Sequence, residues 1–360
     1  MNANAPSHSV YNRKYAPLLH GCAIALALVA VARAPLARGQ AFQGTPTVTA
    51  GSASVNQVGT TDTITVFSDQ VVIDWVPTDT SGAGTIDFLP SGSTGLFQDF
   101  ISFPLANFTV LNRIQPVNAS GVPVSLPIAL NGTVQSRLAS VQGGAVWFYS
   151  PGGIIAGPTS VFDVGGLLLT TNAIAVDPTN ATGNYLFGAS GQTSFAGPSG
   201  STSSVTIQPG ATISALAAGS YVALVAPRVV QGGTVTVNGS AAYVAAEAVD
   251  ITINNGLFDI VFGTGTDDAN GVVHTGTTNG PASTASTDTQ RIFMAAMPKN
   301  SALTMLLTGN IGYTAAASVA QEGSAIVLSA GHDISGVISG GTSSSSAAAN
   351  ISIGNGTYSS

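Results

Sequence analysis

The sequence predicts an all-β chain of short strands in an elongated architecture such as a solenoid, in which strands stack coil on coil, and three observations support this fold class. Short apolar runs, such as residues 146–149, 154–156 and 167–169, are separated by Gly-Gly or Pro-Gly pairs, which indicates strands and tight turns in repetition. None of these runs is long enough for a helix. Only 7% of the 360 residues are charged, against about 25% in an average soluble domain, so Ser, Thr and Asn must solvate the surface.

Residues 1–41 are expected to be a signal peptide. Arg13 and Lys14 precede an apolar run at residues 21–32, and Gly39-Gln40-Ala41 forms a small-x-small cleavage site. A membrane anchor is the competing interpretation, but the run is shorter than the ~20 apolar residues of a spanning helix. The one cysteine, Cys22, lies before this cleavage site, so the remaining chain cannot form disulfides and must rely on ladder hydrogen bonds and packing.

The charge balance after residue 41 disfavours nucleic acid as a partner. All 16 acidic residues follow Ala41, whereas four of the nine basic residues precede it, which leaves five basic residues and a net charge of −11. Phosphate backbones are repelled by this sign, and no basic stripe overturns it. Two remaining histidines and no cysteine predict no metal site, and no motif indicates a cofactor.

The first strands are expected at residues 63–67 and 71–75, where β-branched residues are frequent. A solenoid needs a cap at its first coil, because an open strand edge would otherwise remain. Five aromatic side chains are available to close this end: Trp75, Phe88, Phe97, Phe100 and Phe103.

The rhythm of strand and turn continues beyond Thr171. Asn-Gly turns at Asn238 and Asn255 lie 17 residues apart, close to one coil of three short strands. In a parallel coil, Val, Ile and Leu stack inward while Thr, Ser and Asn face water. The polar residues 262–290 interrupt the pattern and are expected to form a loop outside the helix. Further coils are expected at residues 291–360, which end on an open edge, as in a truncated piece of a longer protein.

A motif series in the first half of the chain resembles one protein family. The segments are, in order, Leu111-Asn112-Arg113-Ile114, Asn131-Gly132, Ser150-Pro151-Gly152-Gly153-Ile154, Ala156-Gly157, and Gly165-Gly166-Leu167 followed by Thr170-Thr171. They resemble the Leu-Asn-Arg-Val, Ala-Asn-Gly, Asn-Pro-Asn-Gly-Ile, Phe-Gly and Gly-Gly-Leu segments of the N-terminal secretion domain of filamentous haemagglutinin-like exoproteins. Two asparagines of the family's Asn-Pro-Asn-Gly turn are replaced by Ser150 and Gly152, and both replacements suit a turn.

The resemblance implies a right-handed parallel β-helix over residues 42–261, with an N-terminal cap and loops outside the helix. It also implies export by the secretory pathway, an outer-membrane transporter of a two-partner system as partner, an extracellular or cell-surface location, and an adhesin that binds a host-cell surface, matrix or glycan as a monomeric rod. The residues expected to serve transporter recognition or folding nucleation are Asn112, Arg113, Asn131, Gly132, Ser150, Pro151, Gly152, Gly153 and Ile154.

Two other functions remain as alternatives. The chain could be the delivery stem of a contact-dependent growth inhibition toxin, whose nuclease or pore-forming tip would lie outside these residues. It could also be a polysaccharide-degrading enzyme, since parallel β-helices include such enzymes, but these need paired carboxylates or a base beside a cation. His274, His332 and Asp333 are the residues nearest to a catalytic set; no nucleophile motif accompanies them, and His274 is expected to lie solvated in the polar loop. We therefore expect no enzyme.

Overall fold

A computed structural model describes residues 40–77, 84–102, 104–118, 120–176, 187, 192–254, 257–334 and 347–359. Within these ranges the chain is built of β-strands, joined by turns and one short 3₁₀ turn, η2 (Val319–Gln321). No helix in the described part is both long and apolar enough to cross a bilayer. The expected signal peptide lies outside the described residues, apart from Gln40 and Ala41.

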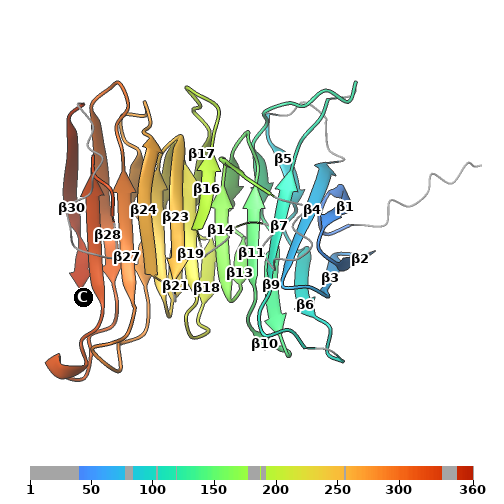
Figure 1. Ribbon diagram of the computed structural model, residues 1–360, viewed down its shortest axis with the longest axis horizontal. Coiled ribbons are helices and arrows are strands. Elements are labelled where there is room, and N and C mark those ends of the chain that lie inside the picture. Colours follow the sequence, from blue (N-terminus) through green and yellow to red (C-terminus); the bar gives the residue numbers. More distant parts are fainter. Residues whose placement is uncertain are drawn as a thin grey trace, which may run out of the picture. The chain divides into compact units, whose positions relative to one another are not determined.

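The strands form a parallel β-helix in which each coil gives one strand to each of three rows (Figure 1). The first row is a parallel ladder whose strands pair in register with the coil before and the coil after. Its members are β4 (Gln70–Pro77), β7 (Thr109–Ile114), β11 (Ala145–Tyr149), β14 (Gly166–Thr170), β19 (Tyr221–Ala226), β22 (Ser240–Ala245), β27 (Arg291–Ala296) and β29 (Ala325–Ala330).

The second and third rows complete each coil. The second row contains β5 (Ile86–Leu89), β8 (Ile128–Leu130), β12 (Ile154–Ala156), β17 (Ser204–Ile207), β20 (Arg228–Gln231) and β25 (Val272–His274). The third contains β3 (Thr61–Val66), β6 (Thr94–Asp99), β9 (Thr133–Leu138), β13 (Val161–Asp163), β18 (Thr212–Ala215), β21 (Thr234–Val237) and β26 (Thr277–Asn279). The long strands β28 (Leu303–Gly312) and β30 (Ala349–Ser359) each extend through both rows. A short strand, β10 (Val141–Gln142), folds back on β9.

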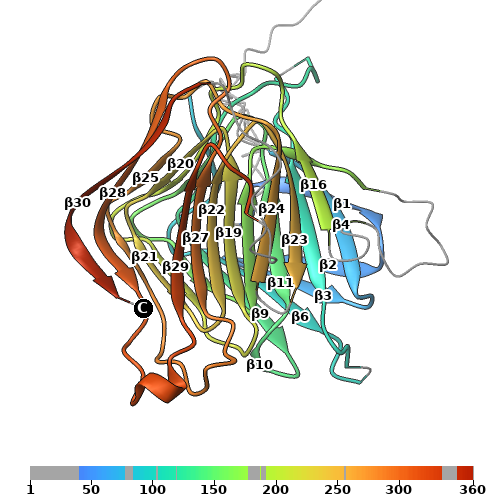
Figure 2. The same cartoon turned by 60° about the vertical axis from the view of Figure 1, so that its left-hand side comes forward.

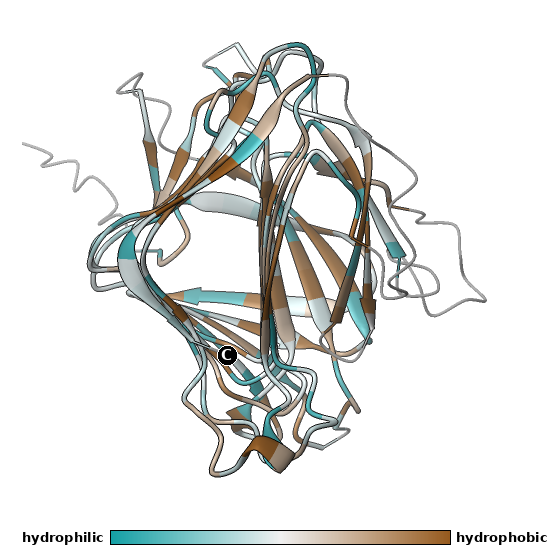
Figure 3. Ribbon diagram, turned by 90° about the vertical axis from the view of Figure 1, so that its left-hand side faces the viewer, coloured by the Kyte–Doolittle hydropathy of each residue, from teal (hydrophilic) through white to brown (hydrophobic). Residues whose placement is uncertain are grey.

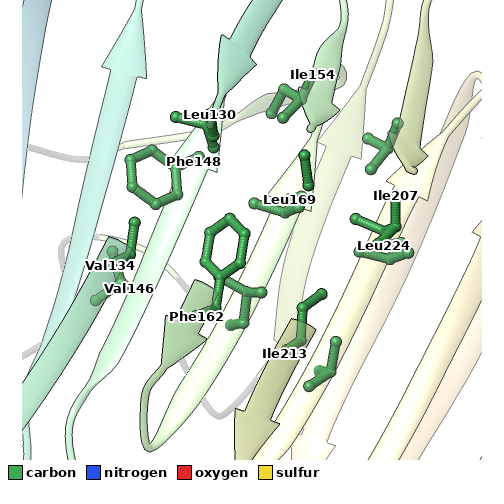
Figure 4. Packing of buried hydrophobic residues seen from close by; sticks show 14 of the residues in the cluster. Leu130, Val134, Val146, Phe148, Ile154, Phe162, Leu169, Ile207, Ile213 and Leu224 are labelled. Atoms are coloured by element: carbon green, nitrogen blue, oxygen red, sulfur yellow. The ribbon is translucent and has the colours of Figure 1, made fainter. Parts of the chain in front are cut away.

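Alternation along each strand sends apolar side chains inward, where they stack on the equivalent residue of the next coil. In the third row Val134, Phe162 and Ile213 are register partners, and all three are buried (Figure 4). In the first row Phe148 pairs with Leu169, which pairs with Leu224. These stacks join into one core cluster along the inside of the coils, as the sequence pattern predicted.

Threonine occupies the outward position of the third row in most coils. The residues that succeed one another in register are Thr61, Thr94, Thr133, Val161, Thr212, Thr234, Thr277, Asn310 and Thr357. None of the nine side chains is buried. Hydroxyl and amide groups on a pleated face bind water without charge, and threonine favours strands. This outward row shows how a chain with so few charged residues solvates its surface.

The N-terminal end of the β-helix is closed by two antiparallel strands. β1 (Gly44–Ala50) pairs with β4, and β2 (Ala53–Val58) pairs with β3. Both strands therefore cover the edges at which the first and third rows begin (Figure 1). This is the cap that the sequence led us to expect, because an open row of backbone N–H and C=O groups would otherwise invite pairing with another chain.

A small antiparallel sheet lies outside the coils against the first row (Figure 2). It consists of β15 (Ala173–Ile174), β16 (Gln192–Ala196), β23 (Ala248–Asn254) and β24 (Leu257–Thr264). Apolar residues from both layers, among them Trp147, Phe258 and Phe293, form a second core cluster. One face of the first row is thereby removed from water. Figure 3 shows the ribbon turned by 90° and coloured by hydropathy, with apolar residues along the strands.

The polar stretch 262–290 is not a loop throughout. Val272–His274 and Thr277–Asn279 form β25 and β26, which pair in register with β20 and β21. They complete a coil of the β-helix, while residues 257–264, expected partly inside and partly before the loop, form β24 of the outer sheet. The prediction was wrong here because Thr278 and His274, both buried, take inward positions normally filled by aliphatic side chains.

Candidate functional site

The residues expected to serve transporter recognition or nucleation lie on two successive coils, β7–β8–β9 and β11–β12–β13. Asn112 and Arg113 belong to β7, and Asn131-Gly132 joins β8 to β9. Residues 150–153 turn the chain from β11 into β12, where Ile154 begins the strand. Ile154 is fully buried and pairs in register with Ile128 and Val205.

Asn112 points into the coil. It lies in register between Ile73 and Phe148, with no exposed surface. Its Oδ1 accepts a hydrogen bond from Trp75 Nε1 at 3.0 Å, and its Nδ2 donates to the carbonyl of Trp147 at 3.2 Å. A buried amide is costly unless both ends are bonded. Here the amide links the coil before β7 to the coil after it, so its role in the folded domain is internal.

Arg113 points outward and forms an ion pair with Asp74, its register partner on β4. The pair is bidentate, with Nε 2.5 Å from Oδ1 and Nη2 2.7 Å from Oδ2, the arrangement in which guanidinium and carboxylate match best. Tyr149 follows in the same position on β11; burial raises the pKa of its hydroxyl, and the Arg113 cation opposes that shift. Arg113 is the only charged residue among the nine residues expected to serve recognition or nucleation, and its ion pair with Asp74 is half-exposed.

The Asn131-Gly132 turn contacts three successive coils. Asn131 Nδ2 donates to Asp87 Oδ1 on the coil before at 2.8 Å, and its carbonyl accepts from Thr159 Oγ1 on the coil after at 2.7 Å. Gly132 is required sterically, since a Cβ there would lie 2.4 Å from the carbonyl oxygen of Ser93. The turn therefore fixes the spacing between coils.

The Ser150–Ile154 turn is built in the same way. Gly153 has a φ of +127°, which side chains rarely adopt, and a Cβ on Gly152 would meet the Leu126 carbonyl oxygen at 2.3 Å. The carbonyl of Pro151 accepts from Ser203 Oγ on the next coil at 2.6 Å. Ser150 Oγ is buried without a hydrogen-bond partner. The turn is thus clamped between the coils below and above it.

These nine residues do not form a single surface. Arg113 lies on the outer side of the first row, whereas the two turns lie at separate connections between rows. What they share is contact with neighbouring coils through hydrogen bonds or through spaces too small for a side chain. The arrangement can set the register between coils, and it offers one partly exposed ion pair.

The cap contains two residues that sequence reasoning missed, Phe42 and Asp62. The Phe42 ring is buried, with its centroid 5.0 Å from that of Trp75 and 5.3 Å from that of Phe88. Phe97 is also buried beside it, as expected, but Phe100 is 39% exposed and lies outside this cluster. Phe103 is outside the described residues.

Asp62 is buried in the same cap, and its carboxylate receives the backbone N–H groups of Ala41 and Phe42. The sequence offers one signal that could have singled out Asp62: it is the only charged residue between Ala41 and Asp69.

His274 lies inside the coils, which corrects the expectation of a solvated side chain. Its ring is fully buried; Nδ1 donates to the Thr308 carbonyl at 2.8 Å, and Nε2 accepts from Thr278 Oγ1 at 2.9 Å. The Tyr243 hydroxyl lies 2.7 Å from the same Thr278 Oγ1. Since a carbonyl only accepts, the neutral tautomer carries its proton on Nδ1, and burial lowers the pKa of the ring.

A catalytic set around His274 is not supported by this geometry. His332 is exposed, and the Asp333 carboxylate accepts the backbone N–H of Phe262 at 2.9 Å. Among the described residues, no group of three or more His, Cys, Asp and Glu side chains is arranged to hold a metal ion.

A capped parallel β-helix with a small sheet on its outer side defines the architectural class of this chain. The secretion domain of HMW1 from Haemophilus influenzae has a similar structure, with a TM-score of 0.52 and 17% identity over 86% of this chain and 83% of that domain. The filamentous haemagglutinin secretion domain matches with a TM-score of 0.42 and 14% identity over 88% and 99% of the two chains. No family model and no curated protein matches the sequence. The HMW1 likeness confirms the fold that the sequence resemblance predicted: this chain is a parallel β-helix with the fold of that secretion domain.

Proposed function

We propose that this chain is a secreted, adhesin-like exoprotein, exported through an outer-membrane transporter of a two-partner system. The observation that carries the proposal is its structural likeness to the HMW1 secretion domain over 86% of the chain. The ordered motif series from Leu111 to Thr171 supports it, because those residues build successive coils of the same β-helix.

In the proposed mechanism, the chain crosses the outer membrane unfolded and the first coils nucleate folding outside. The cap strands β1 and β2 occupy the free edges of β4 and β3. Each later coil then finds a parallel template, with hydrogen bonds along three rows and an inward stack to bury. Backbone pairing and apolar burial drive this addition without an external energy source. The Asn131-Gly132 and Ser150–Ile154 turns hold the register of the coils that form first.

Export would place the protein outside the cell or on its surface. We further propose that the chain, as an adhesin, binds a host-cell surface, matrix or glycan. The rows of outward hydroxyl and amide side chains would form the contact face. A net charge of −11 after residue 41 and a surface with few charged groups fit a partner bound through hydrogen bonds.

The test is export with and without the transporter encoded beside the gene. The full chain is expressed in a Gram-negative host, and its amount in the medium and in the periplasm is measured by immunoblot. We expect at least about tenfold more protein in the medium when the transporter is present. Equal amounts in both strains would contradict a two-partner route, and a transporter with its membrane pore blocked serves as the matched control.

A further inference from the structure

The Asp62 carboxylate lies in the centre of the N-terminal cap with neutral donors around it. Its Oδ1 accepts the backbone N–H of Ala41 at 3.1 Å, and its Oδ2 accepts the N–H of Phe42 at 2.9 Å and Nε2 of Gln57 at 3.0 Å. Asp62, Ala41 and Phe42 are each 0% exposed.

Within the part of the chain that the structure describes, no cation accompanies this carboxylate. None of the ion pairs among the described residues includes Asp62. A buried carboxylate is stabilised far less by neutral donors than by an opposite charge with hydrogen bonds. The cap is thus electrostatically incomplete as long as residue 41 remains attached to residue 42.

Phe42 is the first residue after the expected cleavage site at Gly39-Gln40-Ala41. Hydrolysis there adds one water molecule: the bond from the Ala41 carbonyl carbon to the Phe42 nitrogen breaks, Ala41 leaves as a carboxylate, and the nitrogen becomes an α-ammonium group. We propose that Asp62 is the receptor for this new N-terminus, so that removal of the leader completes the cap with a buried ion pair.

The hydrogen-bond positions around Asp62 fit this exchange. The Phe42 nitrogen already lies 2.9 Å from Oδ2. Removal of Ala41 takes away the donor to Oδ1, and the ammonium has additional N–H groups to replace it. A cationic donor also strengthens the bond that exists.

The position of Phe42 connects the new terminus to the closure of the coil. Its ring packs against those of Trp75 and Phe88 and lies 6.2 Å from that of Phe148 on the third coil. Gly95 is required beneath it, because a Cβ there would lie 2.3 Å from the ring. Since Ala41 and Phe42 are enclosed once the cap forms, hydrolysis has to precede folding. An ion pair at Phe42 would then favour coil nucleation only in a processed chain.

This inference rests on the secretion leader of the proposed function, and its first test is the N-terminal sequence of the exported protein, which we expect to begin with Phe42. A different first residue would overturn the receptor role of Asp62. Transporter-dependent export could still be observed in that case, so the two failures are distinguishable.

The second test is a cycle of four proteins. Residues 42–360 begin either directly with Phe42 or with Gly39-Gln40-Ala41 retained, and each form carries Asp62 or Asp62→Asn. We expect Asp62→Asn to lower the folding equilibrium constant, measured by urea unfolding, at least about tenfold more in the form that begins with Phe42, which corresponds to about 1.4 kcal/mol. Equal effects in the two forms would contradict an ion pair.

A third measurement needs no substitution and remains informative if Asp62→Asn prevents folding. Lys299 is the only lysine after residue 41, so an amine-reactive label has two targets, Phe42 and Lys299. We expect labelling of the Phe42 amine to be at least about tenfold slower in the folded protein than in urea, and slowed more than that of Lys299, whose side chain is 23% exposed. An equal rate at Phe42 in both states would overturn the proposal.

Discussion

The Trp75 indole donates to the Asn112 amide across 3.0 Å inside the first coils, between residues 37 positions apart in the chain. The same amide donates to the carbonyl of Trp147 on the following coil. Three successive strands of the first row are therefore tied together by one polar side chain, which lies in register between the buried residues Ile73 and Phe148. Such a bond is formed only when the coils are in the native register, because a shift by one residue turns Asn112 to the other face.

Replacement of Asn112 by leucine is expected to destabilise the protein by about 1–3 kcal/mol, since the Trp75 N–H would remain buried without an acceptor. Urea unfolding followed by circular dichroism measures the effect. The double variant Asn112→Leu with Trp75→Phe removes donor and acceptor together, and we expect it to regain part of the loss. Strictly additive losses would show that the hydrogen bond carries no weight.

The Arg113–Asp74 pair separates a stabilising role from transporter recognition. Both side chains are partly exposed, at 24% and 31%, and such pairs contribute about 0–1 kcal/mol. Arg113→Ala and Asp74→Ala are therefore each expected to change stability by less than about 1 kcal/mol. If the transporter binds the guanidinium, export falls several-fold in Arg113→Ala and stays near wild type in Asp74→Ala, as measured by protein in the medium. A parallel fall in both variants would assign the pair to folding alone.

Gly152 is expected to tolerate no side chain. Gly152→Ala brings a Cβ to 2.3 Å from the Leu126 carbonyl oxygen, a backbone atom that cannot move aside easily, and overpacking of this kind costs about 1–3 kcal/mol. Gly263→Ala is the matched control, since its nearest neighbour would be 3.5 Å away, and it should change stability by no more than about 0.5 kcal/mol. Thermal unfolding of both variants checks the prediction, which fails if Gly152→Ala unfolds at the wild-type temperature.

His274 makes the later coils sensitive to acid. Burial lowers the pKa of the folded imidazole below the ordinary value of 6.5, so the unfolded chain takes up a proton before the folded chain does. The contribution of His274 to stability is complete above pH 6.5 and is lost as the pH falls from there toward the folded pKa, by up to about 1.4 kcal/mol per pH unit. We expect His274→Gln to lose less stability than the wild type between pH 7 and pH 5 in urea unfolding.

The exposed His332 supplies the control for this pH dependence. His332→Gln should retain the acid-induced loss of the wild type, because it leaves the buried His274 in place. Identical pH profiles for His274→Gln and the wild type would contradict the buried-histidine explanation.

The sequence by itself determined the fold class and the identity of the stacking positions. Three features depend only on neighbouring residues in one strand and its turns. They are the alternation along short runs, the turns at Asn131-Gly132 and Ser150–Ile154, and the Thr-rich polar positions. The need for a cap followed from the same reasoning, and Trp75, Phe88 and Phe97 were found from it.

Only the tertiary structure decided where isolated polar residues would lie. From the local pattern alone, Asn112 and His274 would be expected to face water, since both are hydrophilic. Both point inward instead, because residues from other coils supply their hydrogen-bond partners. Those partners lie up to 37 positions away in the chain. Phe42 and Asp62 meet in the cap for the same reason: the turn from β2 to β3 folds the chain back on its own beginning. Contacts of this kind are set by how coils stack, and a local sequence pattern does not contain that information.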